Sequence, residues 1–401
     1  MLGIVAEYNP FHLGHLHHLQ QAQAQTNADE IIVIMSGNFT QRGEPAIFDK
    51  YFRAQSALAQ GADLVLELPT LFSLASSGYF CQGAVLSLAH CGIDTLAFGS
   101  ENVHLESLQQ IADVLANEPA EYQQFLKAYL KAGHSYPKAQ ELALKQYGNI
   151  SFTSSETPND LLALGYLTTI KKYHLPIQPL AIQRLGSHLT DDTAGFLNAS
   201  AIRKKILQQE SYIQYIPQST AILLAQAQSN GYRPLSLEDF SLAIFVKLRT
   251  ASLAELSSLP DVTEDLAHTL QKVALQTNDL EQLLQQCKSK TYTRTRLCRA
   301  LCHLLLHITK EDVLEQPPYL RILGFNQNGA QILHRLKHTC PIPVLTNASQ
   351  GKSLASAQAK RCFSIDLTSS SVYALGQTHT AHSMLQEEFS RFPIIWDSNR
   401  K

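Results

Sequence analysis

Short apolar runs alternate with helix-like stretches through the first half of the chain. The first run begins at residue 2 and stops at Asn9-Pro10, and the others occupy residues 30–37, 62–69, 95–101 and 177–185. A nearly continuous apolar run indicates a strand that is covered on both faces, and strands that alternate with helices are typical of βαβ units in a parallel sheet. We therefore expect an α/β fold built on a doubly wound parallel sheet.

Strand signals largely vanish beyond about residue 215, and helical periodicity replaces them. Leucine-rich amphipathic stretches lie at 236–258, 263–287 and 293–309. We place a domain boundary at 214–220, so that residues 1–214 form one domain with a helical insertion at 103–150, and residues 215–401 form a mostly α-helical C-terminal domain. Residues 319–324 and 341–345 are compatible with a small α/β unit after these helices, and the tail from about Leu375 with a packed helix.

Composition limits the class of protein. Of the 401 residues, 45% are hydrophobic and 16% are charged, as in folded globular proteins. No basic leader precedes the first apolar run, and no run approaches the length of a membrane span, so we expect a cytoplasmic protein without a membrane partner. The seven cysteines form no C-x-x-C pair and no cluster at zinc spacing, so we predict buried free thiols and no structural metal site.

The turn after the first apolar run carries the strongest chemical signal. Asn9-Pro10 ends the run, and a helical pattern begins directly after it. At the carboxyl edge of a parallel sheet, free N–H groups and the helix dipole favour a phosphate. His12 and His15 lie three residues apart on the first helical turn, where both can donate hydrogen bonds to one phosphate, and Gly14 leaves space for a nucleotide.

The string Glu7-Tyr8-Asn9-Pro10-Phe11-His12-x-Gly14-His15 resembles the signature of the HxGH nucleotidyltransferases, and more narrowly that of the bacterial tRNA(Met) cytidine acetate ligases. A second string, Asn198-Ala199-Ser200-Ala201-Ile202-Arg203, resembles the second signature of that superfamily, although it is also an ordinary capped helix start. The resemblance runs over essentially the whole chain. It implies a Rossmann-like domain in which His12 and His15 stabilise the α-phosphate, while Ser200 and Arg203 hold the departing pyrophosphate.

The resemblance also implies a set of ATP-binding residues. They are Val5, Ala6, Glu7, Tyr8, Asn9, Pro10, Phe11, His12, Leu13, Gly14, His15, Leu16, His17 and His18, together with Gly99, Asn159 and Arg184. From the residues alone, Gly99 could merely end a strand, and Asn159 could cap the helix that follows it. ATP is the expected substrate, and Mg²⁺ would arrive bound to it. No carboxylate cluster in the sequence indicates a metal site built by the protein.

The polar loop after the second apolar run is a further candidate site. Its residues Gly37, Asn38, Gln41 and Arg42 match the family, and we assign them to an acetate pocket. Lys50 and Arg53 in the next helix could bring positive charge to the phosphates or to a small carboxylate, or they could form a solvated basic face. The sequence leaves both interpretations open.

Basic residues gather between positions 284 and 340, where nine Lys or Arg face three acids in a chain of net charge −2. A local excess of this sign is what a nucleic-acid backbone selects. The candidate tRNA-binding residues are Lys288, Lys290, Arg294, Arg296 and Arg299. Alternatively the segment is a solvated helix face, and Arg294 and Arg299 could pair with acids of the first domain.

The resemblance implies an ATP-dependent ligase that activates acetate as acetyl-adenylate and acetylates the wobble cytidine of elongator tRNA(Met) to 4-acetylcytidine. The alternatives are a nucleotidyltransferase that adenylylates a small phosphorylated cofactor precursor, and a non-catalytic RNA-binding protein. The helical domain and its basic segment argue against the first alternative, and the intact motif residues argue against the second. No protein partner is implied, and the sequence does not determine the oligomeric state or the lining of the acetate pocket.

Overall fold

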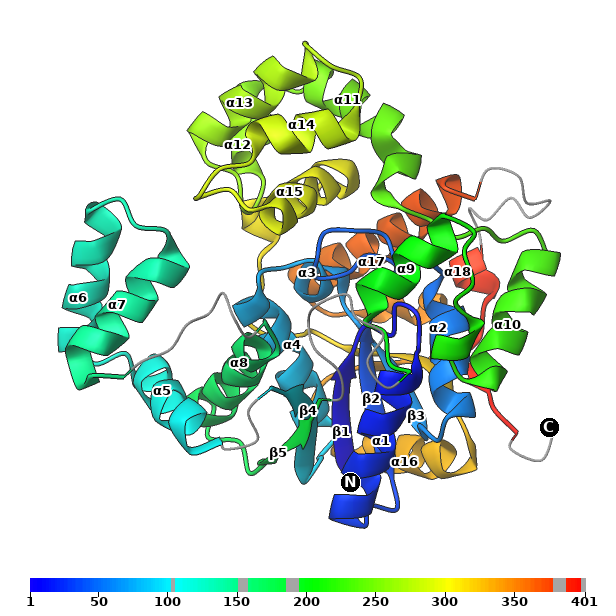
Figure 1. Ribbon diagram of the computed structural model, residues 1–401. Helices are drawn as coiled ribbons and strands as arrows, with labels where there is room; N and C mark the ends of the chain where they lie inside the picture. Colours follow the sequence, from blue (N-terminus) through cyan, green and yellow to red (C-terminus); the bar gives the residue numbers. More distant parts are fainter. Residues whose placement is uncertain (102–104, 151–157, 185–194, 378–386, 398–401) are drawn as a thin grey trace.

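An eight-stranded sheet forms the centre of the molecule in the computed structural model (Figure 1), which describes residues 1–101, 105–150, 158–184, 195–377 and 387–397. The strands are β1 (Leu2–Ala6), β2 (Ile31–Ser36), β3 (Leu64–Leu68), β4 (Thr95–Ser100), β5 (Gln178–Gln183), β6 (Leu320–Phe325), β7 (Val344–Leu345) and β8 (Ile394–Ile395). The first five strands pair in parallel, which confirms the predicted doubly wound α/β fold.

The strand order is β5-β4-β1-β2-β3-β6-β7, with β8 paired to β6. The chain winds from β1 through β2 to β3 on one side and then returns to place β4 and β5 on the other side of β1. Order therefore reverses between β1 and β4, and in such sheets ligands bind in the crevice at the carboxyl ends of the strands at this switch point. Glu7 and Gly99 lie at those two strand ends.

Alternate residues of the buried strands enter two cores. In β2, Val33 and Met35 pack with α1 (Leu13–Thr26) and α2 (Lys50–Ala59), whereas Ile32 and Ile34 face the opposite layer. That layer contains α4 (Ser77–His90), α5 (Leu105–Asn117), α8 (Pro158–Lys172) and α16 (Gln327–Thr339), and the short helix α3 (Thr70–Ser73) packs on α4. Because both faces are covered, β2 and β3 are apolar almost throughout.

The predicted insertion is helical, and it consists of α5, α6 (Ala120–Lys131) and α7 (Tyr136–Gly148). Figure 1 shows α6 and α7 standing away from the sheet on the left. Among the described helices, none combines the length and apolar character that a bilayer crossing requires. All seven cysteines are free thiols and six of them are buried, as predicted.

The second half of the chain supplies most of the remaining helices. They are α9 (Ala199–Leu207), α10 (Gln218–Ser229), α11 (Ser241–Thr250), α12 (Leu253–Ser258), α13 (Glu264–Ala274), α14 (Leu280–Cys287), α15 (Arg294–Leu306), α17 (Ala357–Leu375) and α18 (Glu387–Ser390), with 3₁₀ turns at Ile213–Tyr215, Leu237–Phe240, Lys310–Asp312 and Ala348–Ser353. Helices α11 to α15 share a hydrophobic core and stand above the carboxyl edge of the sheet (Figure 1). We call residues 241–306 the helical unit.

The last third of the chain also extends the sheet. The predicted unit at 319–345 forms β6, α16 and β7, but β6 pairs antiparallel with β3, which the sequence did not predict. The described part of the tail packs back through the four-residue helix α18 and strand β8, whereas the long helix α17 ends at Leu375. One sheet contains strands from both sides of the expected boundary, and the division into domains at 1–214 and 215–401 stays a prediction.

Candidate active site

The turn from β1 to α1 places His12 and His15 against each other. His12 is the N-cap of α1, and its Nδ1 accepts a hydrogen bond from the backbone N–H of Gly14 at 3.0 Å. The backbone N–H of His12 in turn donates to Nδ1 of His15 at 3.3 Å, and the two rings stack with centroids 3.7 Å apart. Because each Nδ1 is an acceptor, the proton of each neutral ring is on Nε2.

Both histidines are held in the neutral state. Burial lowers the pKa of His12 to about 3, and the charges of Arg184 and Arg203 add to this effect. Burial, followed by the neighbouring His12, holds the pKa of His15 well below its usual value. At neutral pH the two rings are therefore hydrogen-bond donors through Nε2–H rather than proton acceptors.

The glycine at position 14 leaves room for the ring of His12. A Cβ atom at this position would lie 2.8 Å from Cε1 and 3.0 Å from Nδ1 of His12, both too close for a side chain. The motif predicts a role for Gly14 in nucleotide access, and the structure adds that a side chain at this position would disturb the His12 ring. That contact depends on the cap geometry of α1, which the motif did not reveal.

The second motif meets the first at the start of α9. Asn198 caps this helix by accepting a hydrogen bond from the N–H of Ala201 at 2.9 Å, which leaves Ser200 in the first turn. The Arg203 guanidinium donates to Ser200 Oγ at 3.2 Å and to the backbone oxygen of Asn9 at 3.0 Å. The two strings, far apart in sequence, thus converge on one region at the carboxyl edge.

Strands β4 and β5 bring Gly99 and Arg184 to the same edge. A Cβ on Gly99 would lie 3.4 Å from Cγ of Arg184, so the two residues are neighbours. Asn159 at the start of α8 donates a hydrogen bond to the Glu101 carboxylate, and Asp160 accepts one from the Glu101 N–H at 3.1 Å. These contacts fix the end of β4 to α8, so the amide of Asn159 is already engaged with the protein.

The four residues assigned to an acetate pocket do not converge. The structure places Gly37 against the Glu67 carboxylate, and buried Asn38 accepts a hydrogen bond from the Lys50 N–H at 2.9 Å. The N–H of Gln41 donates to Glu7 at 2.9 Å, and Arg42 donates to Ser200 Oγ at 3.3 Å. Gly37 and Asn38 therefore lie beside Glu67 and Lys50, while Gln41 and Arg42 contact Glu7 and Ser200, near the two sequence motifs.

Lys50 and Arg53 are not on a solvated helix face, because the side chains are only 1% exposed. Arg53 donates to the backbone oxygens of Phe48, Glu7, Ser36 and Gly37, and so joins the carboxyl ends of β1 and β2. An arginine whose donors are engaged with carbonyl oxygens positions the loops around the site rather than contacting a ligand.

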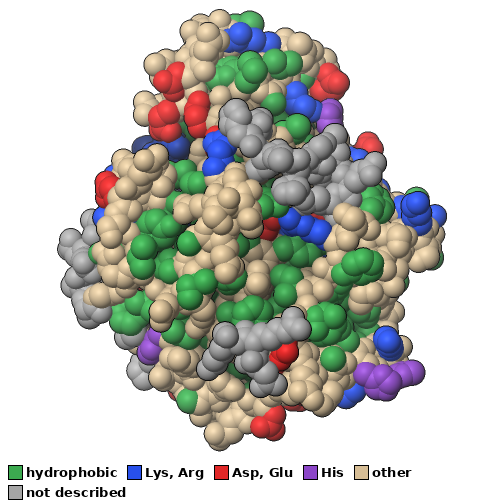
Figure 2. Space-filling view, turned by 90° about the vertical axis from the view of Figure 1, so that its right-hand side faces the viewer, with side chains coloured by type: hydrophobic (Ala, Val, Ile, Leu, Met, Phe, Trp, Pro, Cys, Tyr) green, Lys and Arg blue, Asp and Glu red, His purple; other side chains and the backbone are tan. Residues whose placement is uncertain are grey.

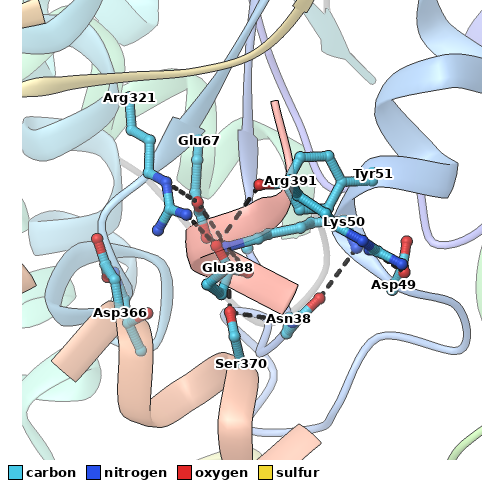
Figure 3. Close-up of polar contacts among 12 residues, drawn as sticks. Asn38, Asp49, Lys50, Tyr51, Glu67, Arg321, Asp366, Ser370, Glu388 and Arg391 are labelled. Atoms are coloured by element: carbon cyan, nitrogen blue, oxygen red, sulfur yellow. Dashed lines mark hydrogen bonds and ion pairs between the residues drawn. The ribbon is translucent and has the colours of Figure 1, made fainter. Parts of the chain in front are cut away.

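Lys50 belongs to a buried ion cluster that the sequence did not predict (Figure 3). Its ammonium lies 2.8 Å from Glu67 and 2.9 Å from Glu388 of α18, and Arg321 of β6 contacts both carboxylates. Ser370 of α17 accepts a further hydrogen bond from Lys50 at 3.1 Å. One signal was present in the sequence, since Glu67 is the single charge in the apolar strand Leu-Val-Leu-Glu-Leu.

The candidate tRNA-binding residues divide into two groups. Lys288, Lys290 and Arg294 are exposed, and Arg294 pairs with Glu281 at 2.7 Å. Arg299 is buried and pairs with Asp261 at 2.7 Å, and Arg296 donates to the backbone of Asp261 at 2.8 Å. The acids that pair with Arg294 and Arg299 thus belong to the helical unit and not to the first domain. Figure 2 shows acidic and basic side chains mixed on one face of this unit.

The carboxylates of Glu7, Glu44 and Glu101 lie near the candidate site, and each contacts a neighbouring group of the protein. Among the described residues, no group of three His, Cys, Asp or Glu side chains is arranged to hold a metal ion. The site is instead rich in hydrogen-bond donors and positive charge, contributed by His12, His15, Ser200, Arg203 and the neighbouring Arg42 and Arg184. Such a set is suited to an anion with several oxygens, such as a polyphosphate.

Comparisons with known proteins agree with this chemistry. A family model described as HIGH Nucleotidyl Transferase matches residues 1–388. The tRNA(Met) cytidine acetate ligase of Thermoanaerobacter sp. (strain X514) is 40% identical over 390 residues, which cover 95% of this chain and 96% of the relative. That of Caldicellulosiruptor saccharolyticus is 37% identical over 399 residues, 98% of each chain.

A solved structure is similar over nearly its full length. It is the crystal structure of Thermotoga maritima TmcAL bound with alpha-thio ATP, which is 31% identical to this chain. The match has a TM-score of 0.92 and covers 98% of this chain and 99% of the other. The apo form I of the same protein matches with a TM-score of 0.93.

Proposed function

Because the chain belongs to the HIGH nucleotidyltransferase family, and within it to the tRNA(Met) cytidine acetate ligases, we propose that it is an ATP-dependent ligase that joins acetate to tRNA. The observation that carries the proposal is the pair of neutral histidines, His12 and His15, on a turn whose Asn9 oxygen accepts a hydrogen bond from Arg203 of α9. Their Nε2–H groups are fixed in direction by the caps on Nδ1, so no reorganisation is needed when charge develops on a phosphate.

In the first half-reaction, an acetate oxygen attacks the α-phosphorus of ATP. A new O–P bond forms, the bond from the α-phosphorus to the bridging oxygen of the β-phosphate breaks, and pyrophosphate leaves with that electron pair. His12 and His15 donate hydrogen bonds to the α-phosphate oxygens, and Ser200 with Arg203 stabilises the departing pyrophosphate. The remaining nucleotide contacts are proposed at residues 5–18 and at Gly99, Asn159 and Arg184.

In the second half-reaction, the exocyclic N4 of the wobble cytidine attacks the carbonyl carbon of acetyl-adenylate. The C–N bond forms, the C–O bond to AMP breaks, and N4 loses a proton to give 4-acetylcytidine. The mixed anhydride is already activated, so no covalent protein intermediate is needed. Elongator tRNA(Met) as the acceptor and Mg²⁺ arriving with ATP are parts of the proposal, and no step depends on a metal held by the protein.

Transfer of radiolabel from acetate to bulk bacterial tRNA tests the proposed function. We expect label in tRNA only when ATP is present, and acetylcytidine as the labelled nucleoside after digestion. A His15→Ala variant should lose this transfer, because one of the two donors to the α-phosphate is gone. The Lys138→Ala variant is a suitable control, since Lys138 forms an exposed pair with Glu141 on α7.

Cleavage of ATP without label in tRNA would contradict the proposal. In that case a small phosphorylated cofactor precursor would be tested next as the acceptor of the adenylyl group. If His15→Ala left ATP binding and turnover unchanged, the non-catalytic alternative would replace both.

A further inference from the structure

Arg42 lies among the phosphate-binding candidates rather than in a separate pocket. Its guanidinium is 3.3 Å from Ser200 Oγ, the same oxygen that Arg203 contacts at 3.2 Å. Burial lowers the pKa of both Arg184 and Arg203, and the charge of Arg42 lowers each pKa further, as expected for three guanidinium groups in one region. Glu44 pairs with Arg203 at 3.6 Å, and the carboxylates of Glu7 and Glu101 also act on Arg203 and Arg184. Guanidinium groups gathered in this way favour the binding of a polyanion.

The loop that carries Arg42 is short and internally bonded. Its N–H of Thr40 donates to the oxygen of Glu44 at 2.9 Å, and its N–H of Ala46 donates to the oxygen of Asn38 at 2.9 Å. The N–H of Gln41 donates to the Glu7 carboxylate at 2.9 Å, which joins the loop to the end of β1. Arg42 therefore projects from the tip of a closed loop, and a shift of the tip would move its guanidinium.

The tip of this loop is packed directly on the helical unit. Gly43 has φ of +77°, and a Cβ at this position would lie 2.2 Å from the backbone nitrogen of Arg299 in α15. The thiol of Cys302, one turn further along α15, donates to the Gly43 oxygen at 3.2 Å. Phe39, at the base of the loop, is buried in the core of the helical unit. In Figure 1 the blue loop after β2 reaches the underside of α15.

We infer that Arg42 binds the triphosphate and stabilises departing pyrophosphate, and that α15 of the helical unit positions it through the contact with Gly43. This inference rests on the proposed function, since it concerns the adenylation half-reaction. It moves Arg42 from the acetate pocket to the phosphate site. It also gives the helical unit, which carries the candidate tRNA-binding residues, a direct connection to acetate activation.

Acetate-dependent exchange of labelled pyrophosphate into ATP measures the first half-reaction without tRNA. In Arg42→Ala we expect kcat for exchange to fall about 10-fold to 100-fold, because an electrostatic donor to the transition state is lost, while KM for acetate stays within about 3-fold. Arg42→Lys should recover part of kcat, because it keeps the charge but not the fork geometry. Lys138→Ala is the matched surface control. Unchanged kcat in Arg42→Ala, or a loss confined to KM for acetate, would overturn the inference.

The role of α15 is tested by variants at its contact with the loop, Gly43 and Cys302, that leave Arg42 unchanged. Gly43→Ala should reduce exchange, and Gly133→Ala is its control, because Gly133 has a similar φ of +86° but no neighbouring atom within 4 Å of an added Cβ. Cys302→Ala should reduce exchange less, and Cys302→Ser should restore it. If α15 acts through Arg42, then adding Gly43→Ala to Arg42→Ala produces little further loss, whereas additive losses would contradict the positioning role.

Failure of this inference is distinguishable from failure of the proposed function. The unmodified protein is assayed in parallel for exchange and for transfer of acetate to tRNA. If it performs both and Arg42→Ala behaves like the unmodified protein, only the inference fails. If the unmodified protein transfers no acetate, the proposed function fails first. Thermal unfolding of each variant, measured by circular dichroism, separates loss of contact from loss of fold, and Cys302→Ala serves if Gly43→Ala does not fold.

Discussion

His15 accepts a hydrogen bond from the backbone of His12 while its ring lies 3.7 Å from the His12 ring, centroid to centroid. The two residues form a reciprocal cap at the start of α1, in which the same side chains that would contact a phosphate also begin the helix. Capping fixes the ring orientation, and burial removes the charge. A motif that has this form is therefore preorganised before any nucleotide binds.

The first prediction concerns the tautomers. We expect nitrogen NMR of the labelled protein to show both His12 and His15 as neutral rings with the proton on Nε2 from pH 8 down to about pH 5, because the pKa of His12 is about 3 and that of His15 is also well below its usual value. His12→Gln and His15→Gln variants assign the signals. A charged ring in either residue at pH 6 would contradict the assignment of both as neutral donors.

The second prediction concerns stability at acidic pH. Burial lowers the pKa of His18 to about 4 from an unfolded value of 6.5, so the unfolded chain binds more protons between these values. Its contribution to the free energy of unfolding is therefore largest above pH 6.5 and is lost as the pH falls toward 4. Urea unfolding between pH 7.5 and 5 should show a shallower loss in His18→Gln than in the unmodified protein.

Asp366 changes the free energy of unfolding in the opposite direction, so the pH profile of His18→Gln must be compared with that of the unmodified protein. Burial raises the pKa of its carboxyl to about 6, so this group favours the folded state as the pH falls through that value. Its effect is present in both proteins and cancels in the comparison. Parallel pH profiles for the two proteins would show that His18 is not buried in the neutral state.

The third prediction concerns Gly14. In Gly14→Ala the added methyl group meets the His12 ring, so we expect the rate of acetate-dependent pyrophosphate exchange to fall about 100-fold, as for loss of an oriented donor. Gly78 provides a matched control, since it is likewise the second residue of a 14-residue helix and an added Cβ would meet nothing within 4 Å. An active Gly14→Ala enzyme would show that the ring arrangement is not required.

The fourth prediction concerns the buried ion cluster. Glu388→Gln leaves Lys50 and Arg321 facing one carboxylate, Glu67, and we expect the free energy of unfolding to fall by about 3–5 kcal/mol. The double variant Lys50→Met, Glu388→Gln should be more stable than the sum of the two single losses predicts, because charge balance is restored. Urea unfolding measures all three, and additive losses would contradict the cluster.

The fifth prediction separates the two groups of basic residues. Replacing exposed Lys288 and Lys290 by Glu should weaken tRNA binding and reduce its dependence on salt, while pyrophosphate exchange without tRNA stays unchanged. Arg299→Ala should instead destabilise the protein by about 3 kcal/mol, because Asp261 loses its partner. Filter binding at several salt concentrations and urea unfolding give the two readouts. Equal tRNA affinity in the Lys288, Lys290 variant would remove this surface from the proposal.

The sequence determined those features that depend on neighbours a few residues away. Periodicity located the five parallel strands in the first half of the chain. The strings at His12–His15 and Ser200–Arg203 carried the resemblance to the family. The cap hydrogen bonds that begin α1 and α9 are also local, since each joins residues no more than three positions apart. Local hydrogen bonds and the periodicity of side chains depend only on residues that are close in sequence, so they can be predicted from it.

Tertiary structure decided which partner each charged side chain has. Lys50 meets Ser370, 320 positions along the chain, and β3 meets β6 instead of a solvated edge. Arg42 points to Ser200 rather than to Asn38, four residues away, because its loop is closed and held against α15. A buried charge can pair with any residue of opposite charge that the fold brings near it. The sequence contains many such residues and does not show which of them will be near. Only the folded arrangement selects among them.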